Sequence, residues 1–143
     1  MRPTHHGQLR LPLRPPLADG PSSAARAFTR QALAQWNLLV SSLCRPHLAE
    51  DALLVVGELV ANACRHGGHG PAELILDIGP GVLRITISDH NPEPPQRRVP
   101  VPGEPGGYGL RILDQLTTCW DASPQAGGKA VWAQLDTGCG RGC

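Results

Sequence analysis

A carboxylate and a carboxamide lie four residues apart near the middle of the chain, at Glu58 and Asn62. On a helix this spacing places both side chains on the same side, one turn apart. Asn62 can offer a carbonyl oxygen to Mg²⁺, which prefers hard oxygen ligands, and Glu58 can orient or deprotonate a hydroxyl group. The alternative is a solvated helix face, although the neighbouring residues are mostly apolar and no lysine lies nearby.

A third candidate, Asp89, directly follows an apolar segment that is typical of a strand. A buried carboxylate can accept a hydrogen bond from an exocyclic amine, which adenine offers at an edge where guanine does not, so it would discriminate between purines. The alternative is a turn-forming aspartate, because His90, Asn91 and Pro92 follow it. The residues alone leave both interpretations open.

Gly107 and Gly109 precede a short amphipathic segment that begins at Leu110. Glycines allow the backbone to approach an anionic ligand closely, and the start of a helix presents unpaired N–H groups and the positive end of a dipole. This combination suits phosphate groups. In a chain with 17 glycines, a flexible connector is the alternative.

His66 ends the apolar helical pattern, immediately before two glycines. The sequence shows no partner for its imidazole, so we expect a structural role, or a role at the end of the helix, and not that of a general base.

The elements that must position these residues follow from the apolar periodicity. We expect an edge strand over residues 9–13, a helix from 22 to about 40, a helix from 46 to 66, antiparallel strands over 73–78 and 82–88, a proline-rich loop over 90–105, a helix over 110–116, and strands over 118–122 and 129–135. Ser22 or Ser23 can cap the first helix, whose apolar stripe would run from Phe28 to Leu39, and Pro46 suits the first position of the second helix. The long loop is a candidate lid.

This order of elements does not alternate single strands with helices, which disfavours a doubly wound parallel sheet. It favours an α+β fold, a two-layer α/β sandwich in which helices cover one face of a mixed, mostly antiparallel sheet.

The length of 143 residues suits one domain. We expect a disordered tail over residues 1–7, the domain over 8–136 and a flexible tail over 137–143. The net charge of +1 creates no field that would attract nucleic acid or an anionic membrane. No apolar run reaches the roughly 18 residues that span a bilayer, and no signal sequence is evident, so we expect a cytoplasmic protein. We expect the five cysteines to be free thiols, and Cys139 and Cys143 supply too few ligands for a zinc site.

Four motifs follow one another along the chain: Glu58-x-x-x-Asn62-Ala63-x-x-His66-Gly67, then Asp89, then Gly107-x-Gly109-Leu110, then Gly128-Lys129-Ala130-Val131-Trp132-Ala133. In these motifs, over about residues 8–136, the chain resembles the Bergerat-type (GHKL) ATP-binding domains. More narrowly, it resembles the anti-sigma-factor serine kinases of bacterial partner-switching systems, especially the single-domain proteins of actinobacteria.

The resemblance implies a Bergerat fold that binds ATP and Mg²⁺ between the Glu58 helix and the lid. It implies that Glu58 is the general base and that Asn62 holds the Mg²⁺ ion. The implied ATP-binding residues are Asn62, His66, Asp89, Gly107, Gly109 and Leu110. The implied partners are an anti-sigma-factor antagonist that carries the target serine, and a sigma factor. No direct contact with nucleic acid or membrane is implied.

The activity that the resemblance implies is ATP- and Mg²⁺-dependent serine/threonine phosphorylation of the antagonist, together with sequestration of the sigma factor. The alternative is a non-catalytic GHKL-fold regulator that binds proteins and binds ATP weakly or not at all. Asn91, Pro92 and Ala130 depart from the family pattern and favour this alternative. A homodimer would use an exposed face of the first helix or of the sheet.

Overall fold

The computed structural model describes residues 7–14, 19–39, 44–66, 70–92 and 109–138. Most of the expected lid and Gly107 lie outside these ranges. The elements occur in the predicted order: β1 (Gly7–Pro12), α1 (Gly20–Gln35), α2 (Leu48–His66), β2 (Pro71–Gly79), β3 (Val82–Asp89), α3 (Gly109–Leu116), β4 (Cys119–Gln125) and β5 (Gly128–Asp136).

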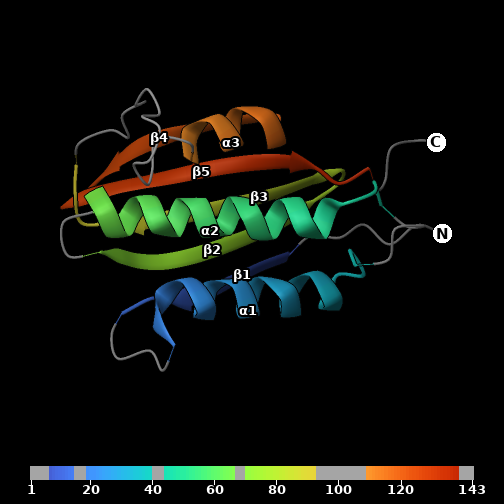
Figure 1. The fold of residues 1–143 in the computed structure, drawn as a ribbon, viewed down its shortest axis with the longest axis horizontal. Coiled ribbons are helices and arrows are strands. Elements are labelled where there is room, and N and C mark those ends of the chain that lie inside the picture. Colours follow the sequence, from blue (N-terminus) through green and yellow to red (C-terminus); the bar gives the residue numbers. More distant parts are fainter. Residues whose placement is uncertain (1–6, 15–18, 40–43, 67–69, 93–108, 139–143) are drawn as a thin grey trace, which may run out of the picture.

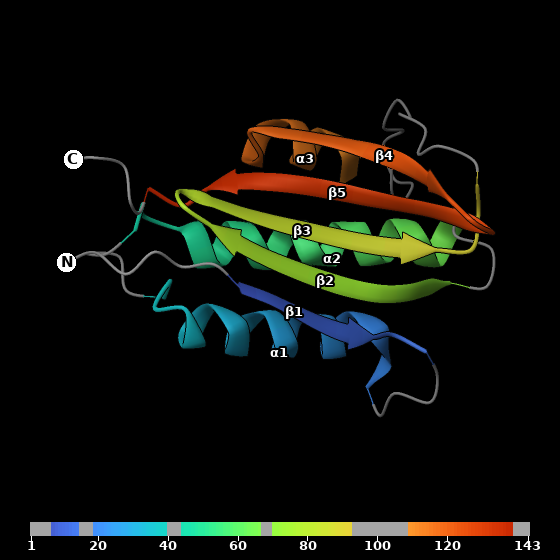
Figure 2. The same cartoon turned by 180° about the vertical axis from the view of Figure 1, so that it is seen from behind.

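The five strands form one sheet in the order β1-β2-β3-β5-β4, and the three helices cover one of its faces (Figures 1 and 2). The predicted α+β two-layer sandwich is therefore confirmed. The expected mixed character of the sheet is wrong for the described strands, because all four neighbouring pairs are antiparallel. Hairpins join β2 to β3 and β4 to β5, and a hairpin reverses the direction of the chain.

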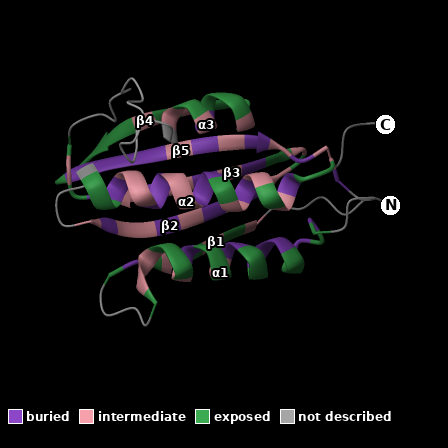
Figure 3. Cartoon of the chain, viewed as in Figure 1, coloured by how far each residue is buried: buried purple, intermediate pink, exposed green. Residues whose placement is uncertain are grey.

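The core lies between the sheet and the helices. Alternate residues of the central strands point inward, which follows from the two-residue period of a strand. Leu83, Ile85 and Ile87 of β3 are each at most 1% exposed, and they lie opposite Leu135, Ala133 and Val131 of β5. Figure 3 shows that β5 is mostly buried along its length, whereas the outer side of α1 is exposed.

The first helix ends earlier than the apolar pattern predicts. The α1 helix stops at Gln35, and Asn37 adopts a φ of 59°, a left-handed conformation that an asparagine tolerates and that ends a helix. Leu39 is consequently 45% exposed and does not extend the buried stripe. The N-cap is Asp19, without a side-chain capping bond, so the expectation that Ser22 or a neighbouring serine caps the helix is wrong.

The second helix begins at Leu48, two residues after the proline at which it was expected to start. His47 has a φ of 63°, so the backbone turns once more before the helix begins. Arg45 links this turn to two elements. Its Nε donates to the carbonyl of Asp136 in β5 at 2.6 Å, and its Nη1 lies 2.8 Å from a carboxylate oxygen of Asp51 in α2.

Two described residues outside the expected limits of the domain belong to its fold. Gly7, which was assigned to the disordered tail, pairs with Ile78 as the first residue of β1. Thr137, which was assigned to the flexible tail, is 1% exposed, and its N–H donates to the carbonyl of Gly81 at 3.0 Å. Within the described ranges, none of the helices is long and apolar enough to cross a membrane.

Candidate functional site

The α2 helix packs one apolar stripe against the sheet and carries its polar residues beside that stripe. Val55, Val56, Leu59 and Val60 are at most 2% exposed. Burial of such side chains is what holds an amphipathic helix on a sheet. Glu58 and Asn62 stand one turn apart on the same side of α2, as their four-residue spacing predicts, and both are partly buried.

Neither Glu58 nor Asn62 has a side-chain hydrogen bond or ion pair with any described residue. Their polar atoms are therefore available to a ligand. A solvated helix face, which was the alternative, would also lack protein partners, so both interpretations of the pair stand. The pair places an acceptor carboxylate and a carboxamide one turn apart on the same helix.

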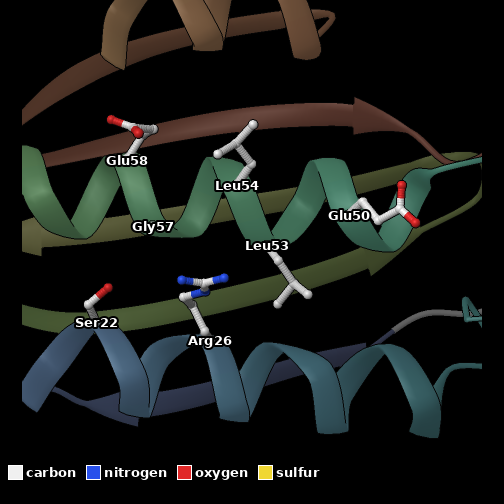
Figure 4. A pocket seen from close by; sticks show the side chains of 7 residues that line it. All are labelled: Ser22, Arg26, Glu50, Leu53, Leu54, Gly57 and Glu58. Carbon is white, nitrogen blue, oxygen red and sulfur yellow. The ribbon is translucent and has the colours of Figure 1, made fainter. Parts of the chain in front are cut away.

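A groove of about 480 Å³ runs between α1 and α2 and reaches Glu58. Figure 4 shows Arg26 pointing from α1 toward α2 and Leu53 pointing from α2 toward α1, while Glu58 and Leu54 leave α2 on its other side. This groove includes neither Asn62 nor Asp89 in its lining, so it is not the expected nucleotide site. Glu58 contributes to its lining, but the Glu58 side chain points to the opposite side of α2 from α1.

The other predicted site residues lie at the ends of elements. His66 is the last residue of α2, and its side chain is outside the described part of the structure. Gly109 is the first residue of α3, and Leu110 is half-buried against the core, so the expected helix start after the glycine turn is present. Gly107 lies outside the described residues.

Asp89 ends the inward-facing row of β3. Asp89 follows Leu83, Ile85 and Ile87 at the two-residue spacing of one strand face. The register of the sheet places it directly opposite Lys129 of β5. Both side chains therefore face the helix layer, at the end of an apolar ladder. Asp89 is 5% exposed and Lys129 is 1% exposed, so this is a buried charged pair.

The Asp89 carboxylate has three hydrogen-bond contacts. Lys129 Nζ lies 2.9 Å from Oδ2 and 3.2 Å from Oδ1. The backbone N–H of Asn91 donates to Oδ1 at 2.9 Å, which is the bond that an aspartate makes in a turn. The turn-forming interpretation of Asp89 is thus part of the structure, but the same carboxylate is also buried and paired.

Gly128 allows the backbone to approach Asp89 closely. A Cβ atom on Gly128 would overlap the carbonyl oxygen of Asp89 and would lie 3.0 Å from Cα of His90. Any side chain would therefore force β5 away from the end of β3. The glycine is what allows the next residue, Lys129, to sit opposite the carboxylate.

Lys129 was not predicted as a site residue, whereas Ala130 was named as a departure from the family pattern. In a strand, neighbouring residues face opposite sides, so Ala130 points away from the helix layer and Lys129 points toward it. The sequence did hold a signal: Lys129 is the only lysine in the chain, among 13 basic residues, and it directly precedes the apolar run of residues 130–133. Its pairing with Asp89 depends on the register of two strands that are 40 residues apart.

The C-terminal end of α2 and the Asp89–Lys129 pair lie toward one end of the sheet, whereas Glu58 stands near the middle of α2. In both views the C-terminal end of α2 lies at the same end of the sheet as the end of β3 and the start of β5 (Figures 1 and 2). The α3 helix lies beside β4 on the same face of the sheet. The carboxylate of Glu58, the carboxamide of Asn62 and the buried Asp89 therefore belong to neighbouring elements, as a shared ligand site requires.

The donor set of the described residues limits the kind of metal site. No group of three or more histidine, cysteine, aspartate or glutamate residues among them lies close enough to hold a metal, and Cys44, Cys64 and Cys119 form no disulfide. Mg²⁺ keeps several waters and commonly binds through one or two protein oxygens together with substrate phosphates. The amide oxygen of Asn62 fits that pattern.

Comparison with known proteins agrees with this architecture. A family model described as the histidine kinase-like ATPase domain matches residues 21–135. The chain is also similar to the crystal structure of the RsbU and RsbW domains of Rv1364c from Mycobacterium tuberculosis, with 18% identity and a TM-score of 0.64. That match covers 92% of this chain and 32% of the other, so the chain spans about a third of that structure, and the likeness is one of fold. No curated protein matches the chain.

Proposed function

Because this chain belongs to the histidine kinase-like ATPase domain family, we propose that it is an ATP- and Mg²⁺-dependent protein serine kinase of the anti-sigma-factor type. The observation that carries the proposal is the pair Glu58 and Asn62, which lie one turn apart on α2, partly buried and without side-chain partners among the described residues. The resemblance to GHKL-type domains is consistent with the fold and with the family match.

Glu58 is the candidate general base. Its side chain is partly buried and points to the side of α2 away from α1, so a serine hydroxyl on another protein would approach it from that side. A carboxylate in this position would accept the hydroxyl proton as the serine oxygen bonds to the γ-phosphorus of ATP, while the bond from that phosphorus to the bridging oxygen breaks and ADP leaves. Because phosphoryl transfer depends mostly on positioning and charge stabilisation, the chain needs no covalent intermediate.

Asn62 would hold the Mg²⁺ ion through its side-chain oxygen. When bound, the ion neutralises charge on the phosphate groups, and Glu58 stands one turn away, close enough to act on the acceptor hydroxyl. His66, one further turn along α2, is proposed as an ATP-binding residue of the same helix. The start of α3 at Gly109, followed by Leu110, presents backbone N–H groups of the kind that bind phosphates.

The proposed partners are an anti-sigma-factor antagonist, which supplies the serine, and a sigma factor, which the domain sequesters. A cytoplasmic location fits both partners. The second candidate function is a GHKL-fold regulator that works by protein contacts without catalysis. One observation favours it: the Asp89 carboxylate, which would bind adenine, is already paired with Lys129 at 2.9 Å.

A transfer assay tests the proposal. Wild-type protein is incubated with Mg²⁺, γ-labelled ATP and candidate antagonist proteins from the same organism, and phosphoserine is measured. We expect transfer by the wild type and a loss of at least 100-fold in Glu58→Gln, with ATP binding retained, because removal of a general base costs about 10²–10⁴ in rate. Arg26→Gln, which changes another charged residue in the lining of the α1–α2 groove, controls for changed partner binding. Equal transfer by wild type and Glu58→Gln would exclude Glu58 as the base.

A further inference from the structure

The two exposed faces of the molecule differ in how their polar side chains are paired. On the open face of the sheet, Gln8 donates to Asp77 at 2.7 Å, and Arg10 lies 3.2 Å from Glu73. These contacts run between neighbouring strands and satisfy the polar groups of that face, so the face suits water. The sequence left open whether a homodimer would use the first helix or the sheet, and the pairing on the sheet disfavours the sheet.

The outer face of α1 and α2 carries charges that the chain hardly uses. Arg26 points from α1 toward α2 and has no hydrogen bond or ion pair with a described residue (Figure 4). The two glutamates of α2 that line the same groove, Glu50 and Glu58, form its acidic rim. Glu50 lies 2.7 Å from His47, but these side chains are 75% and 72% exposed, and such exposed pairs contribute little.

Leu54 stands between the two glutamates of the acidic rim, one turn from each, and is 45% exposed. Beside it, a Cβ atom on Gly57 would meet no atom within 4 Å, so the surface of α2 is open there. Leu53 points from α2 toward α1 and lines the groove next to this opening. The face therefore has a protruding apolar side chain and, close to it, a hollow with an apolar lining that can receive one.

A two-fold dimer joins the same patch of both subunits, so the patch must contain each feature together with its complement. The α1–α2 face contains a protruding leucine with a hollow, and a cation with an acidic rim. We propose that this face binds a second copy of the chain, with Leu54 of each protomer seated over Gly57 of the other and Arg26 of each facing the acidic rim of the other. A partner of another kind would require only one half of each complementary pair.

The size of the face sets the strength of this dimer. Because α1 has 16 residues, the face measures about 24 Å along the helices and about 20 Å across them. Two such faces bury about 1,000 Å², which is the size of weak, transient interfaces, so we expect a dissociation constant in the micromolar range. The dimer needs no nucleotide, and a chain that binds no Mg-ATP would still form it.

Sedimentation equilibrium of the full chain without nucleotide, from low to high micromolar concentration, tests the proposal. We expect the wild type to change from monomer to dimer over this range. Leu54→Glu would bury a carboxylate in the hollow, and Arg26→Glu would set like charges against the acidic rim. Each change should raise the dissociation constant about tenfold or more.

Two matched controls change similar residues on other parts of the surface. Val82→Glu replaces an apolar side chain that is 37% exposed at the start of β3, and Arg111→Glu reverses an exposed cation on α3. We expect both variants to dimerise as the wild type does. Far-UV circular dichroism of every variant verifies that it is folded.

A mixture of Arg26→Glu and Glu50→Arg proteins tests the pairing of charges directly. Each variant alone sets like charges against each other, whereas the mixed dimer joins opposite charges at both contacts. The mixture should therefore dimerise at concentrations at which neither variant does.

Three results would overturn the proposal. The first is a wild type that stays monomeric at high micromolar concentration. The second is a dimer that Leu54→Glu or Arg26→Glu leaves as tight as the wild type, which would mean that another surface forms it. The third is a mixture of the two charge-reversed proteins that stays monomeric.

Discussion

The buried pair of Asp89 and Lys129 makes a quantitative prediction about stability. At a separation of 2.9 Å, and with an effective dielectric constant near 20, the Coulomb attraction amounts to about 6 kcal/mol before desolvation is counted. Removing one partner leaves the other charge buried and uncompensated, which typically costs about 3–5 kcal/mol. We therefore expect Lys129→Met and Asp89→Asn each to lower the free energy of unfolding by about this amount.

The double variant Asp89→Asn/Lys129→Met should be far less damaging than either change alone. It buries no charge, and the carboxamide oxygen introduced at position 89 can still accept the N–H of Asn91, so we expect a cost within about 2 kcal/mol of the wild type. Arg10→Met is the control for an exposed pair, because Arg10 and Glu73 lie 3.2 Å apart with side chains that are 54% and 32% exposed, and its loss should cost less than about 1 kcal/mol.

Urea denaturation at neutral pH, followed by far-UV circular dichroism, measures all four variants. The reasoning would be refuted if Lys129→Met cost less than about 1 kcal/mol, or if the two single costs simply added in the double variant. Either result would mean that the two charges are not coupled in the folded protein.

Three further predictions concern the elements around the site. Gly128→Ala should destabilise the protein by about 1–3 kcal/mol or more and weaken nucleotide binding, because the new Cβ would overlap the Asp89 carbonyl oxygen. Thermal unfolding and a nucleotide titration measure the two effects. An unchanged melting temperature would contradict the close approach of the two strands. Gly57→Ala, in the middle of α2 with no atom near the new methyl group, should stabilise by about 0.5–1 kcal/mol, and a loss of stability would show that the helix surface is not open there. Arg45→Met should cost about 1–3 kcal/mol in urea denaturation, because the Asp136 carbonyl and the Asp51 carboxylate lose their donor, and a neutral result would mean that the turn before α2 is held by other contacts.

Local sequence patterns were sufficient for the elements and for part of the site. The alternation in residues 73–78 and 82–88 predicts the β2–β3 hairpin, and the spacing of Glu58 and Asn62 predicts that they share one side of α2. The ends of the helices were harder to predict, because Asn37 and His47 adopt positive φ values that hydrophobic periodicity does not encode.

Local sequence patterns could not predict the pairing of Asp89 with Lys129, for a different reason. It depends on β3 lying beside β5, which are separated along the chain by α3 and β4, and on a register that no nearby residue specifies. Once that register is known, the two-residue period of a strand assigns Lys129 to the inner face and Ala130 to the outer face. Only the unusual presence of a single lysine in an apolar strand pointed to this position beforehand.

The central claim is that the chain binds Mg-nucleotide with Asn62 as a ligand to the metal. Isothermal titration of the wild type and of Asn62→Ala with ATP, in the presence of Mg²⁺ and again in the presence of EDTA, tests it most directly. We predict saturable one-to-one binding by the wild type with Mg²⁺, weakened at least tenfold in Asn62→Ala, and little difference between the two proteins in EDTA. No binding by the wild type at millimolar Mg-ATP, or equal affinities of both proteins with Mg²⁺, would contradict the claim.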